Sequence, residues 1–408
     1  MASDPTFVIV GAGQAGGWAA ATLRAEGFGG RVVVVGAESY PPHERPPLSK
    51  GVLAGDAGIE KTFLRPPAFY DEKRIELRLG TRVDGIDLRD QRLRLAGGDV
   101  LPYDALLLAT GARVRRLDIP GHDLAGVHYL RTIDDMLAIR ARLGPGVHAA
   151  VVGGGYIGLE VAATARKRGC HVTILEMQDV AMPRVVAPEI GRFYVEVHRS
   201  HGADVRLGVR VARLEGKGRV ERVVAVDGTT VAADLVVIGV GILPDADLAA
   251  AAGLTVENGI VVDEFARTSD PRVFAAGDVA NAWNPALGRR VRLESWQNAQ
   301  NQAIAAAKAM VGKPVAYGEV PWFWSDQYDL NLQMVGLAES WDALVLRGSM
   351  GQGPFTAFYM KQGAVVAANA VNNARDIRFA RKWIGEKRRV DVAKLADPAT
   401  PLKQLDAS

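Results

Sequence analysis

Residues 8–36 read VIVGAGQAGGWAAATLRAEGFGGRVVVVG, and residues 151–176 read VVGGGYIGLEVAATARKRGCHVTILE. Each stretch contains an apolar strand, a glycine-rich turn, an alanine-rich helical segment and a second strand rich in Val or Ile. Farther along, each is followed by hairpin signals and by a buried apolar strand that ends in glycine, at residues 104–111 and 234–241. The repeat predicts two dinucleotide-type folds, and therefore two nucleotide-type ligands.

The glycines of both stretches follow the pattern G-x-G-x-x-G. The first glycine permits a tight turn from strand to helix, the second lets a pyrophosphate approach the backbone, and the third lets helix and strand pack closely. The phosphates then lie at a helix N-terminus, where free N–H groups and the helix dipole favour anions. The glycines concerned are Gly11, Gly13 and Gly16 in the first copy, and Gly153, Gly155 and Gly158 in the second.

An acidic residue distinguishes the two copies. Glu176 ends the second strand of the second copy, where a carboxylate can accept a hydrogen bond from a ribose 2′-hydroxyl. A 2′-phosphate would be repelled there, so the second site is predicted to prefer NADH over NADPH. In the first copy Gly36 holds this position, and Glu38 is the nearest acid. The adenosine end of the first site is therefore less clearly defined.

The composition bounds the possible functions. The chain has 408 residues, of which 48% are hydrophobic and 23% charged, as in a globular protein with two or three cores. Its net charge of +3 is too mild to predict nucleic-acid binding. We expect neither a signal peptide nor a membrane span. The single cysteine, Cys170, excludes an internal disulfide, reads as a small core residue and favours a cytoplasmic location.

No metal site is predicted. His198 and His201 have helical spacing, but no neighbouring Cys, Asp or Glu pattern completes a set of ligands.

Two further segments carry a resemblance to a known superfamily. Ala109-Thr110-Gly111 and Ala276-Gly277-Asp278 accompany the glycine motifs. Together they resemble the flavoproteins of the disulfide-reductase-like superfamily, which have two dinucleotide-binding domains. The resemblance implies that FAD binds to the first copy and that Asp278 holds its ribityl chain. Because the chain has one cysteine, disulfide reduction is excluded.

A narrower resemblance covers nearly the whole chain. Its segments are similar to those of the oxygenase-coupled, NADH-dependent ferredoxin reductases, the family of putidaredoxin reductase and of the biphenyl- and toluene-type dioxygenase reductases. The segments are RPPLSK at 45–50, YLRT at 129–132, GGGYIGLE at 153–160, ESWQNA at 294–299, PWFWSDQ at 321–327 and NNARD at 372–376.

Carried over by position, the resemblance implies two sets of contacts. The FAD contacts are Gly11, Gly13, Ala15, Gly16, Ala37, Glu38, Arg45, Lys50, Val83, Ala109, Thr110, Gly111, Arg131, Gly277, Asp278 and Trp296. The NADH contacts are Gly153, Gly154, Gly155, Tyr156, Ile157, Gly158, Glu160, Glu176, Arg184 and Gly241. Relatives often carry an acid where this chain has Ala37, which is a departure from the family pattern. His43 is a further candidate beside the flavin.

Three residues are expected to act in catalysis. The resemblance places Lys50 at the flavin, where an ammonium would stabilise the negative charge created by hydride transfer. Around Lys50 the sequence shows neither a helix nor a strand pattern. Glu160 is expected to pair with Lys50 and to orient the nicotinamide carboxamide. Trp324 is expected to cover the flavin or nicotinamide, and Trp322 to lie in the core.

From about Pro321 the pattern changes to antiparallel strands and a helix at 375–384. The predicted class is therefore α/β, with two Rossmann-like, glutathione-reductase-like dinucleotide-binding domains and a C-terminal α+β domain with an antiparallel sheet. We expect an FAD-binding domain at 1–112 and 247–320, an NADH-binding domain at 113–246 and a C-terminal domain at 321–408.

Residues 375–389 hold seven Lys and Arg against two acids. This segment is either a solvated helix face or a surface that guides an acidic ferredoxin.

The predicted function is that of an FAD-dependent NADH:ferredoxin oxidoreductase of an oxygenase system. Hydride passes from NADH to FAD, and single electrons pass to a small, acidic [2Fe–2S] ferredoxin. We expect no nucleic-acid or membrane partner, and a monomer or weak homodimer. Two alternatives stay open: a reductase of rubredoxin, a quinone or monodehydroascorbate, and a redox switch that resembles apoptosis-inducing factor.

Overall fold

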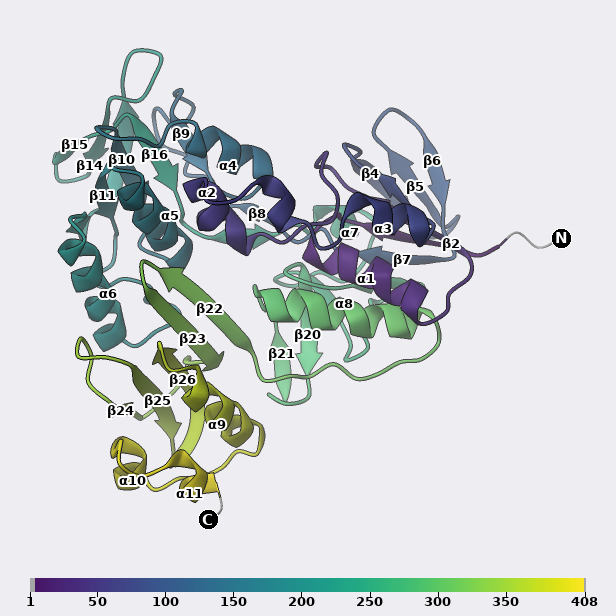
Figure 1. The fold of residues 1–408 in the computed structure, drawn as a ribbon. Coiled ribbons are helices and arrows are strands. Elements are labelled where there is room, and N and C mark those ends of the chain that lie inside the picture. Colours follow the sequence, from purple (N-terminus) through teal and green to yellow (C-terminus); the bar gives the residue numbers. More distant parts are fainter. Residues whose placement is uncertain (1–3, 407–408) are drawn as a thin grey trace. The chain divides into compact units, whose positions relative to one another are not determined.

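The computed structural model describes residues 4–406, and the chain forms two compact units (Figure 1). The two units are interleaved along the sequence. Unit 1 comprises Met1–Pro46, Ile59–Arg113 and Ile242–Glu319, and unit 2 comprises Pro47–Gly58, Val114–Gly241 and Val320–Ser408. Each unit contains one copy of the sequence repeat.

Unit 1 is built on a parallel sheet of strand order β19-β7-β1-β2-β3. The strands are β1 (Thr6–Val10), β2 (Arg31–Val35), β3 (Ile75–Arg78), β7 (Ala105–Leu108) and β19 (Val273–Ala275). The four residues of β7 are all buried, as expected for a strand with both faces covered. In register, Val8 of β1 pairs with Val33 on one side and with Leu106 on the other.

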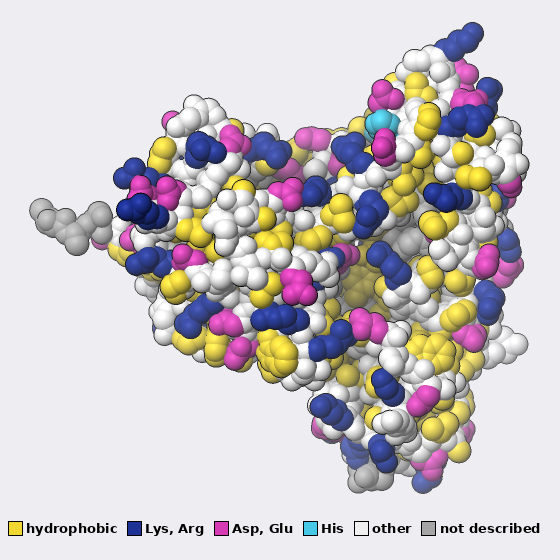
Figure 2. All heavy atoms as spheres, turned by 180° about the vertical axis from the view of Figure 1, so that it is seen from behind, with side chains coloured by type: hydrophobic (Ala, Val, Ile, Leu, Met, Phe, Trp, Pro, Cys, Tyr) yellow, Lys and Arg dark blue, Asp and Glu magenta, His cyan; other side chains and the backbone are white. Residues whose placement is uncertain are grey.

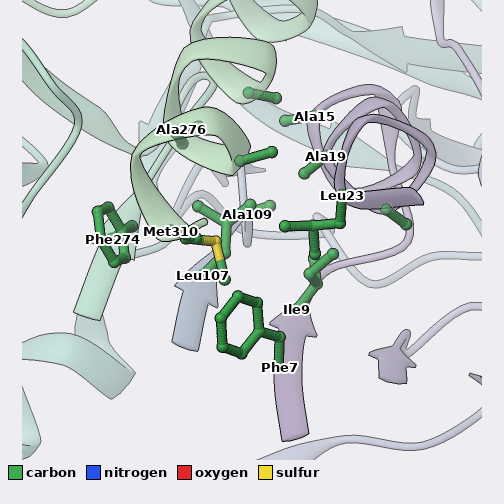
Figure 3. Packing of buried hydrophobic residues seen from close by; sticks show 14 of the residues in the cluster. Phe7, Ile9, Ala15, Ala19, Leu23, Leu107, Ala109, Phe274, Ala276 and Met310 are labelled. Atoms are coloured by element: carbon green, nitrogen blue, oxygen red, sulfur yellow. The ribbon is translucent and has the colours of Figure 1, made fainter. Parts of the chain in front are cut away.

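Two helices cover one face of this sheet: α1 (Gln14–Ala25) and α8 (Trp296–Met310). Figure 3 shows Ala19 and Leu23 of α1 beside Ile9 and Leu107 of the strands, with Met310 of α8 in the same cluster. Alanine and glycine make up most of the buried faces of the two helices, which lets their backbones approach each other and the sheet closely.

The other face of the sheet packs against a second hydrophobic cluster that includes Leu93 and Leu101. These two residues belong to the antiparallel sheet β4-β5-β6, which contains the predicted hairpin at Gly97-Gly98. The remaining elements of unit 1 are η2 (Ile59–Thr62), α3 (Pro67–Glu72), β4 (Val83–Asp87), β5 (Arg92–Leu95), β6 (Val100–Pro102), β17 (Ile242–Pro244), α7 (Asp247–Ala251), β18 (Ile260–Val262), β20 (Ala280–Asn284) and β21 (Arg289–Val291); β8 (Ala112–Val114) ends at the boundary of the unit.

Unit 2 repeats the parallel arrangement, with strand order β12-β11-β10-β16-β9. Its antiparallel sheet β13-β14-β15 corresponds to the second set of hairpin signals. The elements are β9 (Val127–Tyr129), α4 (Ile133–Arg140), β10 (His148–Val152), α5 (Tyr156–Lys167), β11 (His171–Leu175), α6 (Pro188–Ser200), β12 (Asp204–Arg206), β13 (Val211–Glu215), β14 (Arg222–Ala225), β15 (Thr230–Ala232) and β16 (Leu235–Ile238).

Residues 47–58 pack on helix α5, although they precede it by about a hundred positions. Thr164 Oγ1 donates to the carbonyl of Ser49 at 2.8 Å, and the Arg168 guanidinium donates to the carbonyl of Ala54. Lys50 lies between η1 (Pro46–Ser49) and α2 (Gly51–Ala54), two short helical segments in a stretch where the sequence shows no helical pattern. Four-residue turns are too short to leave a periodic pattern in a sequence.

The C-terminal part of unit 2 contains the antiparallel sheet β22-β23-β26-β25-β24, covered by helix α9 (Ala374–Gly385). Trp383 of α9 is fully buried against Phe358 of β25. The predicted strands and helix are confirmed, and with them the α/β class with its α+β C-terminal region. The other elements are β22 (Trp322–Gln327), β23 (Leu330–Gly336), β24 (Ala343–Arg347), β25 (Phe355–Lys361), β26 (Ala364–Val371), α10 (Val392–Ala396) and α11 (Leu402–Asp406).

Over residues 4–406, none of the helices combines the length and the apolar character that crossing a membrane would require.

Candidate functional site

The first glycine loop has the geometry of a dinucleotide cradle. Gly11 has φ +118°, and a Cβ there would stand 2.1 Å from the carbonyl oxygen of Ala109. A Cβ on Gly16 would stand 1.8 Å from the carbonyl oxygen of Gly11. By contrast, a Cβ on Gly13 would meet nothing within 4 Å, although its backbone is in an ordinary extended conformation. The chain itself therefore needs the outer two glycines, whereas Gly13 leaves open space at the helix N-terminus.

The Gly277-Asp278 segment meets this loop within unit 1. A Cβ on Gly277 would stand 3.2 Å from the Cβ of Ala15, in the first turn of α1. The Gly277 N–H donates to Gln302 Oε1 of α8 at 2.9 Å, which fixes the turn that follows β19. Asp278 is thus brought beside the start of α1, where its carboxylate can reach a ligand of the glycine loop.

Glu38, the acid nearest to the predicted adenosine end of the first ligand, follows β2 and has two basic neighbours. Its Oε1 accepts from Arg45 at 2.9 Å, and its Oε2 lies 3.5 Å from His43 Nε2. Burial raises the pKa of Glu38, but the neighbouring His43 and Arg45 outweigh burial and hold the pKa at about 2. Oε2 is buried and has no good hydrogen-bond donor within residues 4–406.

Both amide atoms of Gln14, at the start of α1, are likewise buried and lack partners in the described part of the chain. Buried polar groups normally find partners. A ligand with ribose hydroxyls and a pyrophosphate would supply them to both Glu38 and Gln14. Unit 1 therefore fits FAD.

The other residues assigned to FAD divide between the units. In unit 1, Trp296 begins α8 and its indole N–H donates to Glu44 at 2.5 Å. Thr110 Oγ1 donates to the carbonyl of Asp245, and Val83 begins β4. Lys50 and Arg131 belong to unit 2.

The second glycine loop reproduces the geometry of the first. A Cβ on Gly153 would stand 2.4 Å from the carbonyl oxygen of Gly239, and one on Gly158 would stand 2.2 Å from that of Gly153. A Cβ on Gly155 would meet nothing within 4 Å. Unit 2 thus also leaves room for a pyrophosphate at the N-terminus of its first repeat helix, α5.

Glu176 is held rigidly beside the second loop. Its Oε2 accepts from the Gly154 N–H at 2.6 Å and its Oε1 from the Gln178 N–H at 2.8 Å. The residue is 7% exposed, so the backbone fixes the carboxylate, and each oxygen keeps a lone pair for a ribose hydroxyl. Among the remaining assigned contacts, Arg184 is exposed, and its guanidinium lies 3.5 Å from where a Cβ on Gly241 would stand.

The carboxylate of Glu160 is the centre of a buried polar cluster in unit 2. Its Oε2 accepts from Lys50 Nζ at 2.8 Å and from the Ser49 hydroxyl, and its Oε1 accepts from the Ser325 hydroxyl at 2.6 Å. The expected Lys50–Glu160 ion pair is therefore confirmed. Glu160 is 2% exposed, and donors from two separate parts of the chain, residues 49–50 and Ser325, fix its orientation.

Strand β22 brings its two faces to different partners, because side chains alternate along a strand. Phe323 packs on Tyr156 at the start of α5, with ring centroids 4.6 Å apart, and Ser325 on the same face reaches Glu160. On the opposite face Trp324 stacks on Trp322 at 5.2 Å. The Trp324 indole N–H also donates to Asp326 at 3.0 Å. Trp322 is half-buried and contacts the C-terminal core, while the assignment of Trp324 as a cover stays a prediction.

Sequence reasoning missed Ser49 and Ser325, the two hydroxyl donors to Glu160. Both lie inside segments that carried the family resemblance, beside Lys50 and Trp324. A serine has no charge and no distinctive spacing, so position inside those segments was the only signal that could have identified them.

Cys170 is fully buried, as expected of a core residue. Within residues 4–406, no group of three or more His, Cys, Asp or Glu is arranged to hold a metal ion.

Comparisons with known proteins agree with this geometry. A family model described as pyridine nucleotide-disulphide oxidoreductase matches residues 5–303, and one described as reductase C-terminal matches residues 322–406. The chain is 46% identical over 404 residues to the ferredoxin–NAD(+) reductase component of the anthranilate 1,2-dioxygenase system of Burkholderia cepacia, with 99% of each chain covered.

Putidaredoxin reductase of Pseudomonas putida is 42% identical over 414 residues, covering 100% of this chain and 98% of that protein. Among solved structures, the crystal structure of the covalent putidaredoxin reductase–putidaredoxin complex matches with a TM-score of 0.96 and 41% identity, covering 99% of both chains.

Proposed function

This chain belongs to the pyridine nucleotide-disulphide oxidoreductase family, and within it to the ferredoxin–NAD(+) reductases of oxygenase systems, and we propose that its acceptor is a small, acidic [2Fe–2S] ferredoxin. The enzyme uses FAD and NADH. These cofactors supply the redox chemistry, hydride transfer from NADH to FAD followed by single-electron transfer to the ferredoxin. The cluster around Glu160, next to a glycine loop with room for a dinucleotide, supports the hydride-transfer step, and the likeness to ferredoxin reductases supports the acceptor.

The protein's own contribution is orientation and charge. Because three donors already occupy the Glu160 carboxylate, two on Oε2 and one on Oε1, we propose that its remaining lone pair, on Oε1, accepts the N–H of the nicotinamide carboxamide. The Lys50 ammonium, with a side chain 20% exposed, then faces the flavin and stabilises negative charge on the ring. Trp324 covers the reacting rings. We likewise assign the FAD and NADH contacts and the three-domain division stated for the sequence.

Electrons must leave from the flavin directly. The only cysteine, Cys170, is fully buried in the dinucleotide fold, so no thiol relay can carry them to the surface. A one-electron acceptor that docks near the flavin fits this arrangement, and a disulfide substrate does not.

We place part of the ferredoxin-docking surface on α9. Arg375, Arg378 and Arg381 are exposed on this helix. Figure 2 shows Lys and Arg side chains, with some Asp and Glu among them, over the lower part of the view, where Figure 1 places the C-terminal elements. Arg388 is a weaker candidate, because its guanidinium donates to the carbonyl of Asp406 at 2.6 Å and so holds the C-terminal helix. Such a surface would steer an acidic partner by long-range attraction.

Charge reversal on α9 is expected to weaken ferredoxin use selectively. The double variant Arg375→Glu/Arg378→Glu should raise the KM for ferredoxin about tenfold at low ionic strength and flatten its dependence on salt. The KM for NADH should not change. The matched control is Lys217→Glu/Arg219→Glu, which makes the same charge change on the exposed hairpin between β13 and β14. Equal effects of both double variants would remove α9 from the docking surface.

Cofactor preference is expected to depend on Glu176. Glu176→Gln keeps an acceptor oxygen for one of the two backbone N–H groups and removes the charge that repels a 2′-phosphate, so the NADH-over-NADPH ratio of kcat/KM should fall about tenfold. Adding Met177→Arg, at a site 63% exposed, should supply a cation and lower the ratio further. Steady-state kinetics with both nucleotides measures the ratio, and Met177→Arg alone is the control. An unchanged ratio in the double variant would show that the ribose lies elsewhere.

We further propose that the enzyme acts in the cytoplasm as a monomer or weak homodimer, without nucleic-acid or membrane partners. Sedimentation of the FAD-loaded protein across a concentration series would test the oligomeric state.

The decisive experiment is NADH-driven cytochrome c reduction with and without a panel of [2Fe–2S] ferredoxins and a rubredoxin. We expect one ferredoxin to stimulate the rate strongly. Stimulation by rubredoxin instead, or fast reduction of quinones without any protein carrier, would contradict the proposed acceptor and leave the FAD and NADH assignments standing.

A further inference from the structure

His198 is a buried histidine that the proposed chemistry does not use. It lies on α6, is fully buried, and its Nε2 is 3.0 Å from Gln327 Oε1 on β22. Its Nδ1 is 3.1 Å from the Tyr328 hydroxyl. Gln327 is also fully buried, and its Nε2 donates to the Ser325 hydroxyl at 3.2 Å. Ser325 in turn donates to Glu160, so these residues form one continuous hydrogen-bonded chain.

The Glu160 carboxylate can only accept, so Ser325 must donate to it, and this fixes the direction of every other bond in the hydrogen-bonded chain. Burial raises the pKa of Tyr328 to about 12, so its hydroxyl keeps its proton and can donate to His198 Nδ1. The single proton of a neutral imidazole then lies on Nε2 and is donated to Gln327 Oε1. The Gln327 amide nitrogen consequently faces Ser325. The Ser325 hydroxyl, already accepting from Gln327, directs its own proton to Glu160.

This hydrogen-bonded chain is suited to positioning the Ser325 hydroxyl and not to transporting protons. Burial lowers the pKa of His198 to about 4, against the hydrogen bond to Gln327, which raises it, and with a further lowering by His201. The imidazole is therefore neutral at the pH of the cell. An amide in the middle of the chain also blocks proton relay, because Gln327 would have to exchange its donor and acceptor ends.

The backbone conformation of Tyr328 indicates that its side chain is held in place by its surroundings. Tyr328 has φ +56° in the turn between β22 and β23, a conformation that glycine or asparagine adopts more readily. Its ring stacks on His201 of α6 with centroids 3.7 Å apart. A strained turn that persists is held by its surroundings. Here it holds the hydroxyl against His198.

We propose that Tyr328, His198 and Gln327 are positioning residues. They keep the Ser325 hydroxyl oriented so that it donates its hydrogen bond to Glu160. Without His198, the Gln327 amide is free to rotate and present its oxygen to Ser325. Ser325 would then donate to Gln327, and Glu160 would lose the donor on Oε1. The inference rests on the proposed role of Glu160 in orienting the nicotinamide, and it makes α6 and β22 part of the hydride-transfer site.

The test is a double-mutant cycle on the rate at which NADH reduces the flavin. The rate is measured by stopped-flow absorbance on the FAD-loaded protein. His198→Phe and Ser325→Ala are each expected to lower the limiting rate about tenfold while the apparent Kd for NADH stays within about twofold. The double variant should be no slower than Ser325→Ala, because both changes break one chain. Ser325→Thr keeps the hydroxyl and should restore the rate.

The matched control is Tyr194→Phe. Tyr194 lies one turn before His198 on α6, is fully buried, and its hydroxyl has no hydrogen-bond partner among the described residues. Its removal should leave the reduction rate unchanged. A slowing equal to that of His198→Phe, or losses that add in the double variant, would overturn the proposal and make His198 a packing residue.

A second readout does not depend on turnover. In protein labelled with 15N-histidine, the imidazole of His198 should be neutral and protonated on Nε2, and Tyr328→Phe should weaken the preference for this tautomer by removing the donor to Nδ1. Protonation of His198 on Nδ1 would contradict the proposed hydrogen-bonded chain, whatever rates of flavin reduction the variants show. If Glu160→Gln reduces flavin normally, the proposed role of Glu160 fails, and the tautomer still decides independently whether the chain exists.

Discussion

Replacing Glu160 with glutamine is expected to slow flavin reduction by NADH about a hundredfold, equivalent to about 2.7 kcal/mol of transition-state stabilisation. Ser49, Lys50 and Ser325 all donate to this carboxylate. A glutamine offers one acceptor oxygen and a donor amide, so at least one of the three donors would face an N–H group. The side chain would turn, and the nicotinamide would lose its fixed partner.

The fold should survive this change. The Lys50 side chain is 20% exposed, so its ammonium can turn to water when the partner charge is lost. Stopped-flow reduction, FAD content and thermal unfolding should be measured on the same preparation.

Asp56→Asn is the matched control, because the Lys167–Asp56 pair also joins residues 47–58 to α5 but is exposed. Exposed pairs contribute little, so the rate should not change. Equal rates for Glu160→Gln and the parent enzyme would remove Glu160 from the reaction.

Replacing Gly13 or Gly155 with valine is expected to impair one dinucleotide site and leave the other intact. A Cβ at either position meets nothing within 4 Å, and both residues have extended backbone angles that any amino acid adopts. The apoprotein should therefore fold. The added side chain would occupy the space of the pyrophosphate, and each site should lose affinity about a hundredfold or more.

The two variants should fail differently. Gly13→Val should purify without its yellow colour, with near-normal circular dichroism. Gly155→Val should keep FAD and show a KM for NADH raised by about two orders of magnitude. Bound FAD and NADH kinetics are the measurements. Loss of FAD from Gly155→Val and not from Gly13→Val would reverse the assignment of the two sites.

Gly16→Val is the contrasting control, because its Cβ would stand 1.8 Å from the carbonyl oxygen of Gly11. Here the helix must move away from the strand, so folding itself should suffer. A soluble, well-folded Gly16→Val protein would show that the helix and strand do not pack as closely as described.

The sequence by itself determined the repeated architecture and the presence of two dinucleotide sites, and its resemblance to a known family implied FAD for the first. Strand and glycine spacing are local properties, because the turn from β1 into α1 depends on residues within one short stretch. The position of Glu176 is local in the same sense, since it follows directly from the end of β11. For this reason the two sheets, the C-terminal sheet and α9 were predicted correctly from patterns alone.

Only the tertiary structure decided which side chains surround Glu160. Ser49 and Ser325 lie 111 and 165 positions away from it in the chain, and neither carries a charge that would mark it. Their role exists because α5 receives residues 47–58 on one side and β22 on the other. The same holds for His198. Its spacing to His201 raised only the question of a metal site, and no metal site was predicted. Long-range packing, and not local pattern, gives a neutral buried side chain its partners and thereby its function.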